Sequence, residues 1–299
     1  MPGLNIDTVA AKLNYFARTS DGGKPYNYVA KQPVGVPQSN SQAEEYVLQI
    51  ENVRGKEDAY SLDTSGFYFG KHAASHKSFA NNEEVEKEYY PESIELIKRL
   101  TGASKVVLFD HMSSTPRPTA FKSDELATTQ AIRRRVEGSS GLDPNKRGPV
   151  SRVHVDQTPL AAHNRVRRHL PEEEAEERLK HRFQIINLWR PISHPAEDWP
   201  LAVCDFRSVN WEKDLIPAEL RYSDNIGETF AVKHNPEHKW KYVRGLTPEE
   251  FILIKCYDSI EDGSVAVLTP HTAFQDPTTP AGAPARESIE LRALVFYDD

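Results

Sequence analysis

The sequence predicts a mainly β protein with flanking helices, in which helices of the N-terminal half pack against a mostly antiparallel β-core. Two observations predict this class. After residue 148, short apolar stretches alternate with segments of turn chemistry, as in an antiparallel barrel or sandwich. Before residue 137, apolar residues recur twice at helical spacing. Because no linker composition marks a boundary, we expect one domain over residues 1–299, with an N-terminal arm and helical flank at 1–100 and the core at 101–299.

The N-terminal elements follow from local composition. The first 45 residues are rich in Gly, Pro, Asn and Gln, which predicts an extended arm or an ordered coil over the core. A strand is expected over 44–51. A helix is expected over 91–100, because Pro91 suits a first helical position and the apolar residues that follow can form one inner face.

The core is predicted to be almost entirely strands. A helix over 123–136, capped by Ser123, precedes it, and one further helix over 171–182 has an acidic first turn and a basic last turn that complement the helix dipole. The strands are expected over 105–110, 149–155, 182–189, 201–206, 240–243, 251–257, 264–269 and 289–297.

Composition excludes several classes of protein. A hydrophobic content of 38% is too high for a disordered chain, and no run approaches the roughly 20 apolar residues of a membrane helix. The net charge of −7 argues against nucleic acid as a partner. Two cysteines, Cys204 and Cys256, make no disulfide framework, and the N-terminus shows no secretory signal, so we expect a cytoplasmic protein. One basic patch lacks interleaved aromatic residues and is interpreted as a solvated face: Arg133–Arg135, Arg147, Arg152, Arg165, Arg167 and Arg168.

The most informative local pattern is Arg152-Val-His-Val-Asp-Gln-Thr-Pro159. In a strand, His154 and Asp156 leave the same face, and the two valines point the other way. An imidazole and a carboxylate, joined by a second histidine, form the facial triad of non-heme Fe(II) oxygenases, which leaves positions open for a co-substrate and O₂. The competing interpretation is a chance His-x-Asp in a strand. His154 is the only histidine with an acid two places later.

The best candidate for the third ligand is His271, which directly follows an apolar stretch; His234 and His238 are next in line. A terminal strand beyond it contains Arg286 and Arg292. A buried arginine on a strand needs an anion, and a dicarboxylate such as 2-oxoglutarate supplies one. The competing interpretation is a surface histidine with arginines that pair with neighbouring glutamates.

Either arginine could hold the co-substrate. Arg286 is followed by Ser288, an Arg-x-Ser order that favours it, whereas Arg292 lies deeper in the apolar stretch. In an unbroken strand the two point to one face at Cα positions roughly 20 Å apart, so one co-substrate cannot be held by both. The choice stays open, with a preference for Arg286.

Several stretches together resemble the fungal hydroxylase/desaturase family of Fe(II)/2-oxoglutarate-dependent oxygenases, which is related to gibberellin desaturase-like proteins and the cephamycin 7α-methoxylase component. The resemblance runs from about residue 45 to the C-terminus. The stretches that carry it are Leu108-Phe-Asp-His111, His154-Val-Asp-Gln-Thr-Pro159, Asn187-Leu-Trp-Arg-Pro191, Pro270-His-Thr-Ala-Phe274 and Arg286-Glu-Ser-Ile-Glu-Leu-Arg292.

This resemblance implies a double-stranded β-helix (jelly-roll) core, Fe(II) and 2-oxoglutarate as cofactors, and oxidative tailoring of small natural products. His154, Asp156 and His271 match the family's iron ligands, and Arg286 or Arg292 matches the residue that holds 2-oxoglutarate. One stretch departs from the family pattern. Relatives place an arginine soon after the histidine of Leu108-Phe-Asp-His111, whereas here Arg117 is the first candidate for that contact.

Alternation within Asn187-Leu-Trp-Arg-Pro191 puts Asn187 and Trp189 on one face of a strand and Leu188 and Arg190 on the other. If the first face is inward, the Asn187 amide contacts co-substrate or substrate, and Trp189 forms an apolar wall. Arg190 is a further candidate for a substrate carboxylate. A core tryptophan beside an asparagine in a turn is the competing interpretation.

These features predict a non-heme Fe(II)/2-oxoglutarate-dependent oxygenase that hydroxylates, desaturates or oxidatively cyclises a small natural product in secondary metabolism. Its partners are then the small-molecule substrate and O₂, with a homodimer left open. Two other functions also stay open: a catalytically silent jelly-roll binding protein, and a cupin-like metal hydrolase or isomerase that does not use 2-oxoglutarate.

Overall fold

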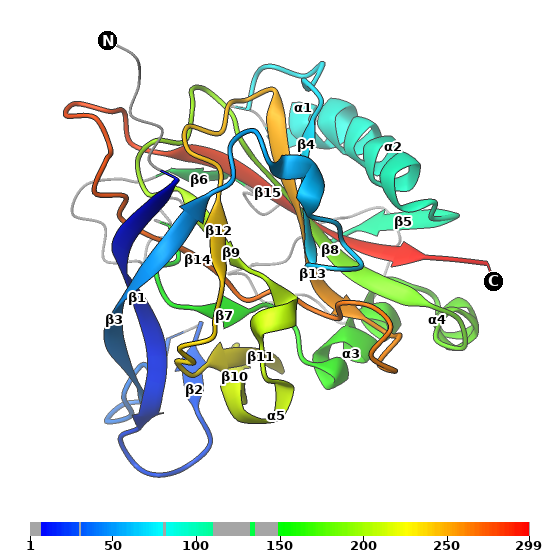
Figure 1. Ribbon diagram of the computed structural model, residues 1–299. Coiled ribbons are helices and arrows are strands. Elements are labelled where there is room, and N and C mark those ends of the chain that lie inside the picture. The colour runs from blue at the N-terminus through cyan, green and yellow to red at the C-terminus, as the bar shows by residue number, and fades with distance from the viewer. Residues whose placement is uncertain (1–6, 30, 80–81, 110–131, 135–148, 299) are drawn as a thin grey trace.

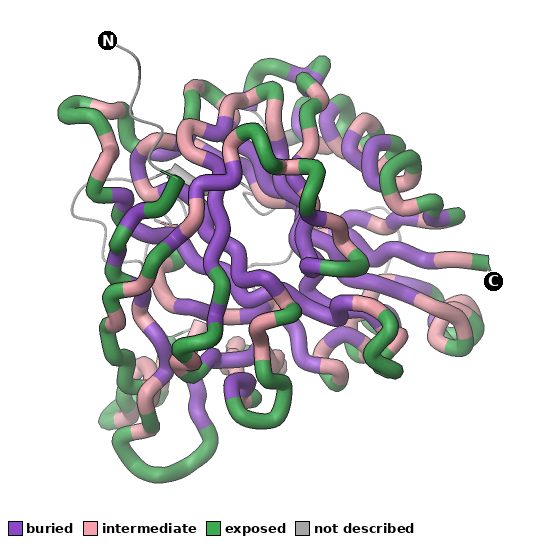
Figure 2. Tube along the Cα trace, in the orientation of Figure 1, coloured by how far each residue is buried: buried purple, intermediate pink, exposed green. Residues whose placement is uncertain are grey.

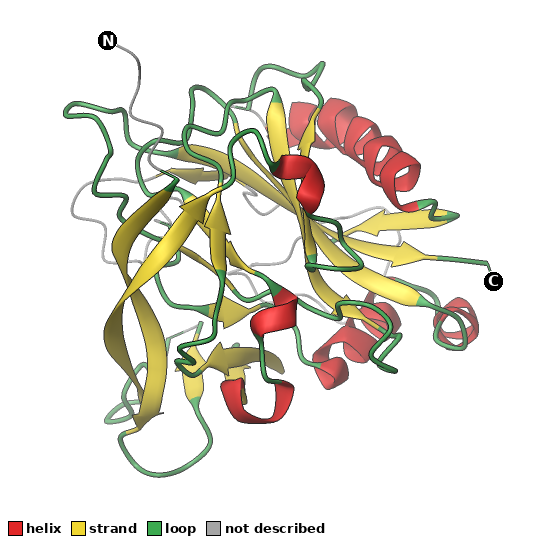
Figure 3. Ribbon diagram, in the orientation of Figure 1, coloured by secondary structure: helices red, strands yellow, loops and turns green. Residues whose placement is uncertain are grey.

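A computed structural model describes residues 7–29, 31–79, 82–109, 132–134 and 149–298 (Figure 1). Two curled sheets face one another, and short helices lie at their rims and over one outer face (Figure 3). Among the described residues, no helix is both long and apolar enough to cross a membrane.

The larger sheet has nine strands and is antiparallel except where β12 joins β3 and where β2 joins β10. In spatial order its strands are β1 (Thr8–Thr19), β3 (Ser41–Asn52), β12 (Trp240–Tyr242), β9 (Leu201–Cys204), β14 (His271–Ala273), β7 (His154–Val155), β11 (Ile226–Val232), β10 (Leu215–Arg221) and β2 (Tyr26–Tyr28).

The smaller sheet has six strands, all antiparallel. Its order is β4 (Phe67–Lys71), β13 (Glu250–Asp258), β8 (Phe183–Pro191), β15 (Glu287–Phe296) and β5 (Lys105–Leu108), with β6 (Ile132–Arg134) paired to the start of β15. The two curled sheets form a double-stranded β-helix, so the mainly β class with a jelly-roll core and flanking helices is confirmed.

Apolar side chains fill the space between the sheets, among them Phe183 and Trp189 from β8, Ile254 from β13 and Val203 from β9. Figure 2 shows the buried residues gathered along the strands that face this space. Because β8 is covered on both faces, all nine of its residues are buried.

The outer face of the smaller sheet is covered by α2 (Tyr90–Thr101), which follows the short helical turns α1 (Asn82–Glu84) and η2 (Val85–Tyr89). Pro91 lies in the first turn of α2, and Gly102 ends the helix in a left-handed conformation with φ 73°. The helix predicted over 91–100 is therefore confirmed.

Two expectations for local structure need correction. Of the extended arm or ordered coil expected at the N-terminus, residues 8–19 are extended, but they form the long strand β1 of the sheet, which pairs with β3 from Thr8↔Glu51 to Thr19↔Ser41. Residues 264–269 form no strand, because their backbone runs beside loops: the amide of Ala266 donates to the carbonyl of Asp63 at 2.7 Å. Their apolar side chains are nevertheless buried.

The helices of the second half also differ from expectation. The helix predicted over 123–136 falls mostly outside the described residues, and its last part is the strand β6. The helix predicted over 171–182 ends earlier, as α4 (Glu172–Arg178), and the sequence prediction missed α3 (Pro159–His169) before it. Three short elements complete the fold: η1 (Glu57–Ala59), η3 (Phe206–Ser208) and α5 (Trp211–Asp214).

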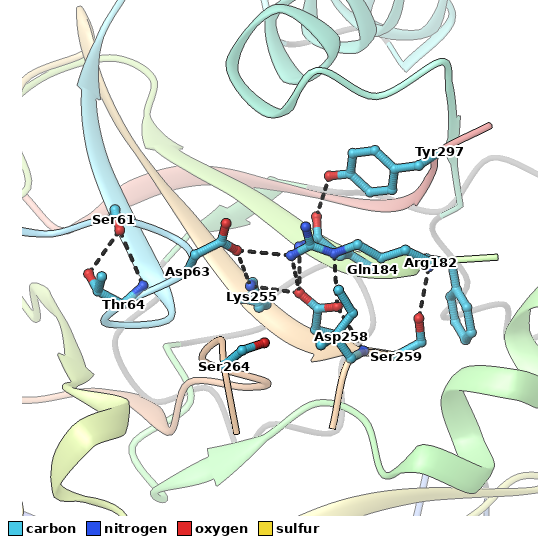
Figure 4. Close-up of polar contacts among 12 residues, drawn as sticks. Ser61, Asp63, Thr64, Arg182, Gln184, Lys255, Asp258, Ser259, Ser264 and Tyr297 are labelled. Carbon is cyan, nitrogen blue, oxygen red and sulfur yellow. Dashed lines mark hydrogen bonds and ion pairs between the residues drawn. The ribbon is translucent and has the colours of Figure 1, made fainter. Parts of the chain in front are cut away.

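A buried ion network links the end of the smaller sheet to the loop after η1 (Figure 4). Asp258 accepts hydrogen bonds from Arg182 at 2.7 Å, Gln184 at 2.7 Å and Lys255 at 2.8 Å, and Lys255 also contacts Asp63 at 2.9 Å. Tyr297 donates to Gln184 at 2.7 Å. The side chains of Lys255 and Asp258 are fully buried. We call these six residues the Asp258 network.

Candidate active site

The three predicted metal ligands meet at the centre of the nine-stranded sheet. His271 on β14 is the direct cross-strand partner of His154 on β7, so the two imidazole rings are 4.4 Å apart between centroids. The carboxylate of Asp156 completes the group, and the ligand atoms of the three residues all lie within 4.8 Å of one another. We call these three residues the His154 cluster.

Strand alternation turns the cluster toward the space between the sheets. Val153 and Val155 are buried against the apolar core on the opposite face of the nine-stranded sheet. His154 and Asp156 therefore leave the inner face, as their spacing predicted.

The backbone fixes the tautomer of both histidines. His154 Nδ1 is 2.8 Å from the carbonyl of Arg152, and His271 Nδ1 is 3.0 Å from the carbonyl of Thr269. A carbonyl only accepts, so each Nδ1 carries a proton, and in the neutral ring Nε2 is then the nitrogen with a lone pair for a metal. Burial, together with the nearby His271, lowers the pKa of His154 from 6.5 to about 4. The imidazole is therefore neutral at pH 7.

Asp156 is held by donors from the opposite sheet. Asn187 Nδ2 donates to Asp156 Oδ2 at 2.6 Å, and the guanidinium of Arg292 is 3.3 Å from the same oxygen. Asn187 and Arg292 are direct partners on β8 and β15. Burial alone raises the pKa of Asp156, but Arg292, the two cluster histidines and the Asn187 amide together hold that pKa well below its usual range. Asp156 is therefore ionised.

A small cavity of about 30 Å³, partly open to solvent, adjoins the cluster. Trp189, Arg286, Glu290 and Arg292 line it together with His154 and His271. Arg286 directly precedes β15 and Arg292 lies within it, and the side chains of both line this one pocket although six positions separate them.

Arg286 is buried beneath the pocket. It donates to the carbonyl of Trp199 at 2.5 Å, and its guanidinium lies 5.4 Å from the centre of the Trp189 ring. Ser288, two residues further on, is also buried, and its hydroxyl has no hydrogen-bond partner among the described residues.

The structure does not bring every candidate to the site. Asn187 and Trp189 face the cluster, whereas Arg190 leaves the other face of β8, donates to the carbonyl of His72 at 3.1 Å and lies over the rings of Tyr89 and Phe251. Strand alternation therefore removes Arg190 from the site. Arg117 lies outside the described residues.

The two alternative third ligands, His234 and His238, lie away from the cluster, whereas two residues that the sequence did not indicate lie near it. His238 bonds to Tyr15 and Asp214 in the core behind the sheet, and His234 stacks on Tyr46. Sequence reasoning missed Glu290, although it shares its strand face with Arg292, and it treated Cys256 only as packing. The thiol of Cys256 is 3.8 Å from Asp156 Oδ2.

Two imidazoles and one ionised carboxylate on a double-stranded β-helix, with arginines beside them, define a mononuclear non-heme iron oxygenase. The family model described as "Oxidoreductase/YMDC permease-like domain" matches residues 13–296. The hydroxylase/desaturase efuI of Hormonema carpetanum is 35% identical over 98% of this chain and 96% of its own length. The Fe(II)/2-oxoglutarate-dependent dioxygenase nvfI of Aspergillus novofumigatus is 31% identical over 91% of this chain and 90% of its own length.

A solved structure agrees. That of the iron and alpha-ketoglutarate-dependent endoperoxidase NvfI superposes with a TM-score of 0.78 at 28% identity, over 97% of this chain and 98% of that chain. The chain belongs to this oxidoreductase family of hydroxylases/desaturases and Fe(II)/2-oxoglutarate-dependent dioxygenases. It is an enzyme of that kind, which sets aside the silent binding protein and the hydrolase or isomerase that does not use 2-oxoglutarate.

Proposed function

We propose that this enzyme oxidises a small natural product by hydroxylation, desaturation or oxidative cyclisation, with Fe(II) held by His154, Asp156 and His271. The observation that carries the proposal is the direct pairing of His271 with His154, which brings two imidazoles to the Asp156 carboxylate. Bound Fe(II) and 2-oxoglutarate supply the oxidant from O₂, with release of CO₂ and succinate. Aspirochlorine biosynthesis protein N of Aspergillus oryzae, 44% identical over 48% of this chain, supports a natural-product role.

The cluster fits Fe(II) on the chemistry of its donors. Each imidazole has a defined Nδ1–H donor bond to the backbone and an Nε2 lone pair for a metal, and Asp156 is ionised. Asn187 donates to Oδ2, whereas Oδ1 accepts only a long hydrogen bond of 3.4 Å from Arg292 and lies 3.7 Å from His154 Nε2, so Oδ1 is the oxygen that would ligate a metal.

We assign the binding of 2-oxoglutarate to Arg286 and Ser288. Arg292 contacts two carboxylates, Asp156 and Glu290, the latter at 3.2 Å, and so acts as a positioning residue for Asp156. Arg286 lines the pocket two residues before Ser288, whose hydroxyl lacks a partner among the described residues. A guanidinium next to a hydroxyl suits a carboxylate, and Trp189 forms the apolar wall of the same pocket.

Cellular location and domain organisation are further parts of the proposal. We place the enzyme in the cytoplasm, where the buried free thiols of Cys204 and Cys256 remain reduced, and we propose one domain over residues 1–299.

Anaerobic titration with Fe(II) and then 2-oxoglutarate tests the assignments through the metal-to-ligand absorption band. Arg286→Gln should weaken 2-oxoglutarate binding about 100-fold and leave Fe(II) binding unchanged, because a buried charge pair is lost. Arg292→Gln should instead weaken Fe(II) binding. A large loss of 2-oxoglutarate affinity in Arg292→Gln alone would reverse the assignment. A metabolite screen for O₂-dependent succinate formation then identifies the substrate.

A further inference from the structure

Helix α3 contains Arg165, one of the arginines that the sequence pattern assigned to a solvated face. The helix begins at Pro159, three residues after Asp156, and the Thr158 side chain caps it by accepting from the amide of Ala161 at 3.2 Å. Ala162 and Val166 are buried in the core between the sheets. Arg165, on the turn between them, is half-buried, whereas Arg167 and Arg168 on the same helix are exposed.

Arg165 has no anionic partner in the described part of the chain. Its guanidinium carbon lies 5.4 Å from the centre of the Phe109 ring, and it forms no hydrogen bond or ion pair there. Arg167, by contrast, pairs with Glu176 at 2.7 Å. Removing a cation from water without a counter-charge costs free energy, so burial lowers the pKa of Arg165.

Arg165 is linked to the His154 cluster through Phe109 and Arg292. The amide of Phe109 donates to the carbonyl of Arg292 at 2.8 Å, so the ring under Arg165 adjoins the residue that holds Asp156. Besides burial, Tyr222, Arg292, Arg168 and Asp156 all influence the pKa of Arg165, and two of these residues belong to the site. Arg152, two residues before His154, also forms no ion pair among the described residues, but its pKa is lowered by burial alone, without influence from those charges.

The other charged groups around the site already have direct contacts with one another. Arg292 lies against Asp156 and Glu290, and the backbone amide of Arg286 donates to the Asp198 carboxylate at 3.2 Å. The charges of Fe(II) and doubly ionised 2-oxoglutarate cancel. The three carboxylates exceed these two arginines by one charge, so Arg165 offsets the net charge of the site without pairing directly with any carboxylate in the described part of the chain. Its guanidinium donors are therefore left for an anionic group of a ligand.

We propose that Arg165 binds an anionic group of the substrate, so that the substrate is an organic acid, a carboxylate or a phosphate, on an apolar body. This inference rests on the proposed function, because it takes the His154 cluster as the reaction centre. The Phe109 ring supplies the apolar surface next to the charge.

Two matched dyes test the charge preference without any turnover. 1-Anilinonaphthalene-8-sulfonate carries an anion, and N-phenyl-1-naphthylamine has the same rings without it. Fluorescence titration of anaerobic protein loaded with Fe(II) and 2-oxoglutarate should show the sulfonate bound about 10- to 100-fold more tightly. Arg165→Gln should abolish this preference, and Arg165→Lys should retain most of it. Arg167→Gln, on the exposed side of the same helix, and Arg152→Gln should keep the full preference.

The inference fails if the wild type shows no preference for the sulfonate, which includes the case in which neither dye binds. It also fails if Arg165→Gln keeps the preference, or if Arg152→Gln loses it instead. Displacement of the sulfonate by 1-naphthoate or by 1-naphthyl phosphate identifies which acid fits better.

The absorption band separates this inference from the proposed function. If the wild type shows no band with Fe(II) and 2-oxoglutarate, the proposed function fails whatever the dyes do. If Arg165→Gln weakens 2-oxoglutarate binding as strongly as Arg286→Gln is expected to, the anion at Arg165 is the co-substrate, and the inference fails. An unchanged 2-oxoglutarate affinity in Arg165→Gln supports a substrate anion.

Discussion

The Asp258 network and the His154 cluster are both buried groups of charged and polar side chains, yet they differ in how completely their atoms are paired. In the Asp258 network every buried side-chain nitrogen and oxygen has a partner (Figure 4). Around the His154 cluster, Asn187 Oδ1 and Ser288 Oγ have none among the described residues. A saturated network stabilises one structure, whereas leftover donors and acceptors in a buried site leave room for a ligand.

The largest expected effect is the loss of a metal ligand. His271→Ala should reduce activity at least about 1000-fold and abolish tight Fe(II) binding, because two remaining ligands hold the ion poorly. Iron content and succinate formation measure this. His181→Ala, a surface histidine after α4, should retain both. Full activity in His271→Ala would place the third ligand elsewhere.

The corresponding change in the saturated network should act on stability. Asp258→Asn leaves Lys255 and Arg182 without their shared carboxylate and should cost about 3–5 kcal/mol in the free energy of unfolding, measured in urea. The folded fraction should still bind Fe(II) with the affinity of the wild type. Asp262→Asn, an exposed substitution nearby, is the control.

The same variant has a pH signature. Burial alone raises the pKa of Asp258, but Arg182, Lys255 and Gln184 outweigh it and lower the pKa below its usual value. Asp258 therefore contributes stability above its unfolded pKa of about 4, and that stability is lost as the pH falls through its folded pKa. Asp258→Asn should flatten the fall in stability below about pH 4. An equally steep fall would contradict the pairing.

A smaller effect is expected where a residue positions a ligand. Asn187→Ala removes the donor to Asp156 Oδ2 and should weaken Fe(II) binding about 10- to 100-fold, with little change in 2-oxoglutarate affinity once iron is saturating. Asn164→Ala, an exposed asparagine on α3, should change neither constant. Unaltered Fe(II) affinity in Asn187→Ala would mean that Arg292 alone holds the carboxylate.

The smallest effect on catalysis is expected for Arg190, the arginine on the outer face of β8. Arg190→Met should leave the affinity for 2-oxoglutarate and the turnover rate unchanged. It should lower the free energy of unfolding by about 1–3 kcal/mol, because it loses the bond to His72 and the contact with the Tyr89 ring. A selective loss of activity at full stability would return Arg190 to the site.

The sequence predicted what depends on local spacing. The two-residue step from His154 to Asp156 and the alternation of Asn187 and Trp189 against Arg190 predict faces of strands, and each side chain lies on the predicted face. Two missed elements also had local signals. The burial of alternate residues in the first half of β1 follows its apolar pattern, and Thr158 before Pro159 is a cap followed by a first-turn proline.

Contacts between residues far apart in the sequence could not be predicted from local patterns. Lys255 lies in an apolar stretch, and its two acidic partners, Asp63 and Asp258, are 192 and 3 positions away. Nothing local indicates that the more distant one reaches it. The apolar stretch 264–269 lacks a strand for the same reason, because burial can be read from residue type but a hydrogen-bonded neighbour cannot.

The brevity of β7 and β14 has a consequence for the metal itself. These strands contain two and three residues, and a single residue pair, His271↔His154, joins them in the middle of the nine-stranded sheet. An ion bound by both histidines therefore cross-links β7 and β14 at the point where the fewest backbone hydrogen bonds join neighbouring strands of the sheet. The amide protons of β7 and β14 should exchange with deuterated solvent more slowly when Fe(II) is bound. Metal binding would then stabilise the nine-stranded sheet as well as complete the reaction centre.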